Sequence, residues 1–247
     1  MHLQKNKFKK NGFFKVENFF DKKTIKKIKK DITNLPKKNV DVYFDKKNKL
    51  RRIERLYDKS KNLKNINRKV NSFLNDFFEK KFKIFKDKFN AKPPGGEGFD
   101  AHYDGIFHYI NNNNKIKNGW YEYGDNFINV LIALDNSYKK NGTIQIAKAH
   151  RGSFNKLLNN TKKDFTPNLK PSVEKKLKFK IIDLNAGDIV IFKNTCPHRS
   201  RKNKSKLDRK TLYYTYLPTK YGFKYKQYFK DKSDSKNSTS KSLSGDI

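Results

Sequence analysis

The stretch FDAHYDG, residues 99–105, places His102 and Asp104 two positions apart. The stretch is strand-like, and in a β-strand residues i and i+2 point to the same face. An imidazole and a carboxylate would therefore converge from one rigid element. A non-haem iron(II) site uses two histidines and one carboxylate. The stretch thus predicts β-structure here and raises a metal site as a hypothesis, for which a second histidine must come from elsewhere.

Short strand-like runs continue after this stretch and are separated by turn residues. They are NFINVLIALDN, GTIQIAKA, KFKIIDL, DIVIFKN and KTLYYTYLP. NAG at 185–187 and KKNG at 139–142 are typical hairpin turns, so each is predicted to join two of these runs as a hairpin. Residues 152–176 interrupt them with a helix and a loop. Many short strands with regular turns favour a sandwich or barrel.

The N-terminal part has helical patterns instead. Asp21 can cap a helix with apolar positions Ile25, Ile28 and Ile32. A second helical pattern is predicted over 60–90, with the apolar residues Val70, Phe73, Leu74, Phe77, Phe78, Phe82 and Phe85. We therefore expect one domain over 1–230, made of a helical N-terminal layer (1–90) and a β-core (91–228). A polar tail is expected over 231–247.

The composition combines a strong positive charge with many aromatic rings. The formal net charge is +35, and 14% of the 247 residues are aromatic. The basic residues are mostly Lys and run along the whole chain, whereas base-reading proteins prefer Arg. Together with abundant Asn, this pattern is typical of an AT-rich coding sequence, so no specific nucleic-acid partner is expected. The charge should nevertheless favour anionic ligands.

A single cysteine, Cys196, excludes an internal disulfide framework and a cysteine-based zinc site. No apolar run is long enough for a transmembrane helix, and the N-terminus lacks the apolar core of a signal peptide. We therefore expect a cytoplasmic protein without a membrane partner. The sequence leaves the oligomeric state open.

His198 is the best candidate for the second histidine. It follows the strand-like run GDIVIFKN in the segment TCPHRS, at a strand end. Eleven residues later, Arg209 begins another strand, in which alternation places it on one face with Thr211, Tyr213 and Thr215. A buried arginine is costly unless it is paired, so Arg209 implies a bound carboxylate, and a bidentate pair suits a dicarboxylate co-substrate.

Taken together, these motifs resemble the phytanoyl-CoA dioxygenase-like family of Fe(II)/2-oxoglutarate-dependent oxygenases. The similarity runs from NGFFKVENFFDKKTIKKIKKDI to about Pro218, and its most specific parts are AHYDG, LDNSYKKNGTIQIAKAHRGSF, NAGDIVIFKNTCPHRSRKNKS and DRKTLYYTY. It implies a mainly β fold with helices, a double-stranded β-helix (jelly roll, cupin-like) core flanked by N-terminal helices. Where the family usually has PGSH, this chain has AKAH, which puts the loop around His150 in question.

The resemblance also implies roles for single residues. His102, Asp104 and His198 would be the catalytic iron ligands, and Arg209 would hold the far carboxylate of 2-oxoglutarate. Ser200 and Asn129 match positions near that co-substrate. O2 would be the oxidant, with succinate and CO2 as products. Halogenases of the superfamily have Gly or Ala in place of Asp104, so the carboxylate here implies hydroxylation, or a cleavage or desaturation that begins with the same hydrogen abstraction.

The substrate is less well defined by the sequence. Trp120 and Tyr121 could surround an amine by cation–π contact, although a merely packed loop is an equal alternative. Arg151 and Lys92 could bind a phosphonate or carboxylate. These residues suggest a small polar, anionic or zwitterionic metabolite that is amino-acid-like or aminoalkylphosphonate-like. The alternatives are a nucleic-acid demethylase of the same superfamily and a non-catalytic jelly-roll binding protein.

Overall fold

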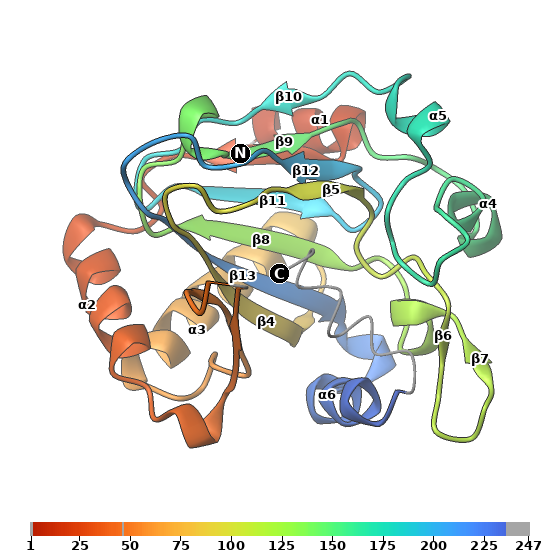
Figure 1. Cartoon of the computed structure of the whole chain (residues 1–247), viewed down its shortest axis with the longest axis horizontal. Helices are drawn as coiled ribbons and strands as arrows, with labels where there is room; N and C mark the ends of the chain where they lie inside the picture. The colour runs from red at the N-terminus through yellow and green to blue at the C-terminus, as the bar shows by residue number, and fades with distance from the viewer. Residues whose placement is uncertain (1, 46, 236–247) are drawn as a thin grey trace.

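The computed structural model describes residues 2–45 and 47–235, shown in Figure 1. The helices are α1 (His2–Asn11), α2 (Lys22–Thr33), α3 (Lys61–Phe78), α4 (Phe154–Leu158), α5 (Pro171–Glu174) and α6 (Tyr225–Asp234), with short 3-10 turns η1 (Lys37–Asn39), η2 (Gly119–Glu122), η3 (Lys139–Asn141) and η4 (Thr219–Tyr221). The strands are β1 (Phe13–Val16), β2 (Asp41–Phe44), β3 (Leu50–Glu54), β4 (Phe82–Lys92), β5 (Phe99–His102), β6 (Tyr109–Ile110), β7 (Ile116–Lys117), β8 (Ile128–Ala133), β9 (Ile144–Ile146), β10 (Lys180–Ile181), β11 (Ile189–Lys193), β12 (His198–Ser200) and β13 (Arg209–Pro218).

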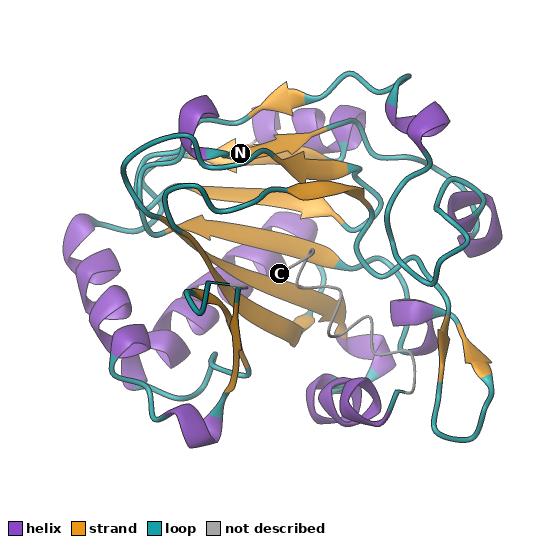
Figure 2. Cartoon of the chain, in the orientation of Figure 1, coloured by secondary structure: helices purple, strands orange, loops and turns teal. Residues whose placement is uncertain are grey.

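Two antiparallel sheets form the body of the protein. The large sheet has the strand order β1-β11-β8-β13-β4-β3-β2, and the small sheet has the order β10-β9-β12-β5. Figure 2 shows the helices around the outside of these sheets. Strands β6 and β7 form a separate pair that projects from the body.

Alternation along the central strands divides the large sheet into two faces. Val130 and Ile132 of β8 belong to the apolar cluster that includes α2 and α3, whereas Leu131 and Ala133 belong to the cluster shared with the small sheet. Because side chains alternate along a strand, Asn129 shares the inward face with Leu131 and Ala133. The inward face of the large sheet therefore lies against the small sheet, and its outward face is covered by helices.

The inward face becomes polar toward the β13–β4–β3 end. Directly opposed residues of an antiparallel pair lie on the same face. Arg209, Thr211, Tyr213 and Thr215 of β13 oppose Lys92, Asn90, Lys88 and Lys86 of β4. On the other side of β4, Arg52 and Glu54 of β3 oppose Asn90 and Lys88. A set of cations thus lies on the face that points toward the small sheet.

The second predicted helix extends too far. The helix α3 ends at Phe78, where Glu79 takes a left-handed conformation with φ 54° and its amide bonds back to Asn75. Phe82 and Phe85 belong instead to β4, so the last part of the predicted helical layer is a strand of the large sheet. The aromatic spacing continues the helical period by chance, while the Lys86–Lys88 alternation is that of a strand.

The two predicted hairpins are also wrong. Residues 139–142 join β8 of the large sheet to β9 of the small one, and residues 185–187 connect β10 to β11 in the reverse direction. The turn residues set a sharp reversal, but the strands on either side pair with other partners.

The chain beyond residue 230 is only partly described. Residues 231–234 complete α6 rather than a loose tail, and the remainder of the predicted polar tail, 236–247, lies outside the described residues. Among the described helices, none combines the length and the apolar character required to span a lipid bilayer.

The turn after β5 depends on Gly105. This glycine has φ 78°, and a Cβ on it would lie 2.4 Å from Cγ of Trp120. The Trp120 amide donates to the Gly105 carbonyl at 3.0 Å. The close approach fixes η2 against the turn that carries Asp104.

We predict that Gly105→Ala destabilises the protein by at least about 2 kcal/mol more than Gly95→Ala, because overpacking adds to the backbone strain. Gly95 is the matched control, since it has φ 76° and its Cβ would meet nothing within 4 Å. The left-handed backbone alone should cost about 1 kcal/mol there. The measurement is chemical denaturation of both variants and the wild type. Equal stability of the two variants would contradict the packing argument.

Candidate metal centre and its cavity

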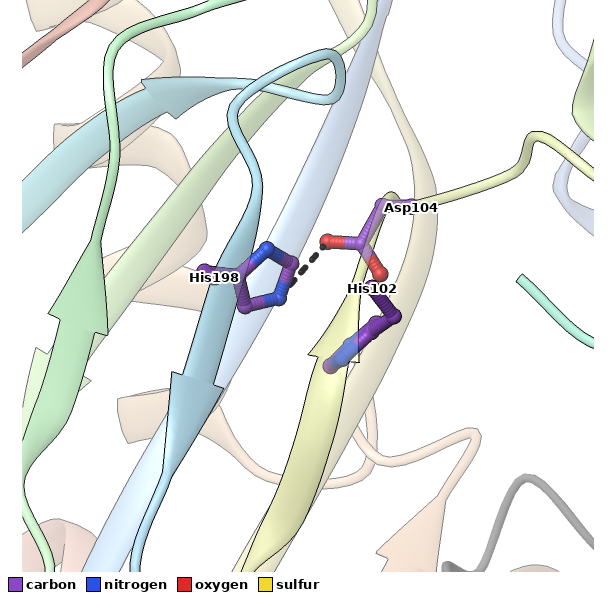
Figure 3. Close-up of side chains that lie close together, drawn as sticks. All are labelled: His102, Asp104 and His198. Atoms are coloured by element: carbon purple, nitrogen blue, oxygen red, sulfur yellow. Dashed lines mark ion pairs between the residues drawn. The ribbon is translucent and has the colours of Figure 1, made fainter. Parts of the chain in front are cut away.

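His102, Asp104 and His198 lie together between the two sheets. One ligand atom from each lies within 4.8 Å of the others, an arrangement that could hold a metal ion. Strand pairing produces this proximity, because His198 of β12 is directly opposite His102 of β5. Asp104 lies two residues past the end of β5, and its Oδ2 is 3.6 Å from His198 Nε2 (Figure 3). The three side chains predicted from the sequence are therefore brought together.

The hydrogen bonds of the two imidazoles suit metal binding. His102 Nδ1 is 2.6 Å from the Asp100 carbonyl, and His198 Nδ1 is 3.1 Å from the Cys196 carbonyl. A carbonyl oxygen can only accept a hydrogen bond, so each ring donates through Nδ1–H and keeps its Nε2 lone pair. Burial lowers the pKa of His102 to about 3, with His198 adding to the effect, and burial also lowers the pKa of His198. Both rings are thus neutral, the form that binds metals.

Asp104 is oriented by a chain of polar side chains. Asn129 donates from Nδ2 to Asp104 Oδ2 at 2.9 Å, and Thr215 donates to Asn129 Oδ1 at 2.7 Å. Burial alone would raise the pKa of Asp104, but the nearby His198 and Lys88 outweigh it and hold the pKa below its usual value. The Asp104 carboxylate is therefore ionised, the form that could bind a metal ion. Asn129, which the sequence placed near the co-substrate, contacts the Asp104 carboxylate and orients it.

Arg209 and its neighbours form a buried cationic group. Arg209 is 2% exposed, and its Nε has no hydrogen-bond partner among the described residues. Lys92 donates to Ser200 Oγ at 2.8 Å and to the Arg201 carbonyl at 2.6 Å. Burial lowers the pKa of Lys92 to about 5, helped by the charges of Arg209 and Arg51. A buried guanidinium is unfavourable without an anion, so the unpartnered Nε of Arg209 fits a carboxylate ligand.

A cavity opens beside the three candidate ligands. It is lined by Arg52, Lys86, Lys88, Asn90, Phe99, His102, Tyr103, Asp104, Gly105, Phe107, Trp120, Ile144, Pro167, His198, Arg199, Ser200 and Tyr213. Both sheets and the η2 region therefore contribute to it.

The residues predicted to bind substrate are only partly found in this cavity. Trp120 lines it, but Tyr121 does not and packs against Phe154 with ring centroids 5.0 Å apart. Arg151 is exposed and outside the lining. Lys92 has no exposed surface, and its ammonium group already donates to Ser200 Oγ and to the Arg201 carbonyl. The geometry thus lends no support to Tyr121, Arg151 or Lys92 as substrate contacts.

Three cations of the cavity were missed from the sequence: Arg52, Lys86 and Lys88. The sequence did contain a sign of their inward position, because Lys86 and Lys88 alternate with apolar or buried residues as in a strand. It was hidden by the assignment of this segment to a helix, and by the abundance of lysine in the chain.

Comparisons with known proteins place this site in a family. The family described as Phytanoyl-CoA dioxygenase (PhyH) matches residues 8–211. The 2-aminoethylphosphonate dioxygenase of Uncultured bacterium HF130_AEPn_1 is 27% identical over 245 residues, which cover 94% of this chain and 87% of that protein. The methylphosphonate hydroxylase of Gimesia maris is 28% identical over 150 residues, which cover 60% of this chain and 50% of that protein.

Solved structures are similar in fold. EctD from S. alaskensis, in a crystal structure with 2-oxoglutarate and 5-hydroxyectoine, has a TM-score of 0.69 at 14% identity and covers 89% of this chain and 77% of its own. The non-heme alpha ketoglutarate dependent carbocyclase SnoK has a TM-score of 0.66 at 11% identity, over 87% of this chain and 83% of its own. This likeness confirms the predicted jelly-roll core.

The predicted enzyme class and cofactors are confirmed as well: a dioxygenase that works with iron, 2-oxoglutarate and O2. The match over residues 8–211 leaves little of the chain outside it. The chain belongs to the phytanoyl-CoA dioxygenase family.

Proposed function

We propose that this enzyme hydroxylates a small anionic or zwitterionic metabolite, amino-acid-like or aminoalkylphosphonate-like, and that His102, Asp104 and His198 bind its iron. The observation that carries the proposal is the convergence of these three ligand atoms within 4.8 Å beside a cavity rich in cations. The names of the two curated relatives, which act on phosphonates, support the substrate class.

In this proposal, Arg209 and Ser200 hold the distal carboxylate of 2-oxoglutarate. The free Nε of Arg209 supports this assignment, since a guanidinium binds a carboxylate through two parallel hydrogen bonds. Ser200 lines the cavity and is fixed by Lys92, which faces Arg209 across the β13–β4 pair. When bound, the iron and 2-oxoglutarate would use O2 to form succinate and CO2 and to deliver the other oxygen atom to the substrate as a hydroxyl group.

The protein's own residues then orient the reactants and limit water. Asn129 keeps the Asp104 carboxylate in one orientation through its bond to Oδ2. Phe107 and Trp120 are 8% and 4% exposed and form an apolar wall of the cavity. An apolar wall strengthens the electrostatic interactions inside and excludes side reactions with water. The cations that line the same cavity would hold an anionic substrate.

We predict that His198→Ala abolishes the weak visible charge-transfer band that forms when iron(II) and 2-oxoglutarate are added without O2. The loss of iron(II) affinity should exceed the roughly 10–100-fold loss that is typical when a residue beside a metal ligand is changed, because a proposed ligand itself is removed. Succinate release should disappear with it. His2→Ala, at an exposed position of α1, is the control and should match the wild type. A variant that keeps both the band and succinate release would refute the ligand assignment.

Asn129→Ala should lower the affinity for iron(II) by about 10–100-fold while leaving all three ligands in place. The physical reason is that the Asp104 carboxylate loses the donor that orients it. The affinity is measured by anaerobic titration in the presence of 2-oxoglutarate. Asn155→Ala, on the exposed surface of α4, serves as the control. Unchanged iron affinity would show that Asn129 does not position the ligand.

Arg209→Lys should weaken 2-oxoglutarate binding by roughly 10-fold or more, because lysine keeps the charge but loses the planar fork. Iron(II) binding without co-substrate should stay the same, since Arg209 is not a ligand. Calorimetry with 2-oxoglutarate, with iron(II) present and O2 absent, gives the comparison. Equal affinity in variant and wild type would exclude the bidentate contact.

The substrate class is tested by succinate release over a panel of small phosphonates, amino acids and a methylated oligonucleotide. Iron-dependent release with a phosphonate or an amino acid supports the proposal. Release with the oligonucleotide, together with removal of its methyl group, would instead establish nucleic-acid demethylation.

A further inference from the structure

Three basic side chains of the large sheet line the cavity beside its aromatic residues. Lys86 and Lys88 of β4 and Arg52 of β3 line it, and all three lie on the inward face of the large sheet. Lys86 is 5% exposed and Arg52 is 2% exposed. Burying three like charges together is costly, so this arrangement calls for negative charge in the cavity.

The carboxylates of the protein compensate only part of this charge. Glu54 is fully buried and pairs with Arg52 at 3.7 Å, but it also binds Lys232 of α6. Asp104 is taken up by Asn129 and by its proposed role as a metal ligand. Two carboxylates, Glu54 and Asp104, therefore face four cations: Arg52, Lys86, Lys88 and Lys232. A bound metal ion would add further positive charge.

Lys88 is the cation that is free to bind a ligand. Lys86 donates to the Tyr228 hydroxyl at 2.9 Å, and its ammonium group lies 5.4 Å from the Trp120 ring. By contrast, Lys88 makes no hydrogen bond or ion pair with the described part of the chain, and its Nζ lies 4.9 Å from the ring of Tyr213. Burial lowers its pKa to about 7, although Asp104 opposes this, and Lys86 and Arg52 lower it further.

The charge and the number of donors indicate the kind of anion. A carboxylate has one negative charge and two oxygens, whereas a phosphonate or a phosphate monoester has up to two charges and three oxygens. A group of three cations around one cavity therefore matches the charge and the oxygens of a phosphonate or phosphate monoester better than those of a carboxylate. The same cavity contains Arg199, but its guanidinium is already used by Gln145 at 2.9 Å and Glu174 at 2.5 Å.

We propose that Lys88, together with Lys86 and Arg52, binds a tetrahedral phosphorus oxyanion of the substrate, with Lys88 making the direct charge-assisted contact. This inference rests on the proposed function, because it assigns the substrate's anionic group to the cavity beside the proposed iron ligands. It also moves the anion contact from Arg151 and Lys92, which the sequence suggested, to the inward face of β4 and β3.

The test is calorimetry on the full chain with iron(II) and 2-oxoglutarate and without O2. The probes are 2-aminoethylphosphonate, methylphosphonate, O-phosphoethanolamine and 3-aminopropanoate, the last being a carboxylate analogue of the first. Wild-type protein should bind 2-aminoethylphosphonate or methylphosphonate, and 3-aminopropanoate at least about 10-fold more weakly than the better of the two. Comparable binding of O-phosphoethanolamine would extend the substrate class to phosphate monoesters, whereas weaker binding would restrict it to phosphonates.

Three variants locate the contact. Lys88→Met keeps the length of the side chain, removes its charge and should weaken binding of the phosphorus probe by about 30-fold, while Lys88→Arg should restore it to within about 5-fold. Lys83→Met is the matched control, because Lys83 is an exposed lysine on the same strand. At saturating iron(II) and 2-oxoglutarate the absorption band should form in all of them, which separates substrate binding from assembly of the centre.

Three outcomes would overturn the inference while the proposed function stands: wild-type protein that forms the band but binds neither phosphonate, 3-aminopropanoate that binds as tightly as 2-aminoethylphosphonate, or Lys88→Met that binds like Lys83→Met. Absence of the band in wild-type protein would overturn the proposed function, and this inference with it.

Discussion

The pairing of β12 with β5 is the interaction on which the site depends. It sets His198 directly opposite His102, and the bond of each Nδ1 to a carbonyl of the same segment fixes both rings. Two short strands would be a weak support by themselves. They are held because β12 also pairs with β9 and because the large sheet packs against their other side through Leu131, Val190 and Phe192. The positions of His102 and His198 are thus set by main-chain register, which a change of surface residues does not alter.

The proximity of the candidate ligands could be predicted from the sequence because these residues lie on or next to regular strands. The period of two in FDAHYDG was enough to place His102 and Asp104 on one side, and the inward position of Arg209 followed from the same rule in the strand that it begins. His198 could be chosen because it follows a long apolar strand. Each of these inferences used local geometry alone.

Other features depend on contacts that no local pattern contains. The strand β4 follows α3 after three residues and carries aromatic residues that continue the helical period, so the helix was extended through it. The turns at 139–142 and 185–187 have hairpin residues, but whether the strands beside a turn pair or separate into two sheets is decided by the whole jelly roll. The hydrogen bond from Asn129 to Asp104 could not be read from the sequence, because the two residues are 25 positions apart.

The two ends of the cavity are built from different parts of the fold. The candidate metal ligands come from the small sheet and the turn after it, whereas Lys86, Lys88 and Arg52 come from the large sheet, where α6 supports them through the Lys86–Tyr228 and Glu54–Lys232 contacts. Mutations that arise in α6 can therefore reshape the cationic end without disturbing the register of the small sheet. Homologous chains could therefore diverge in the anion that the cavity accepts while the candidate metal ligands stay the same.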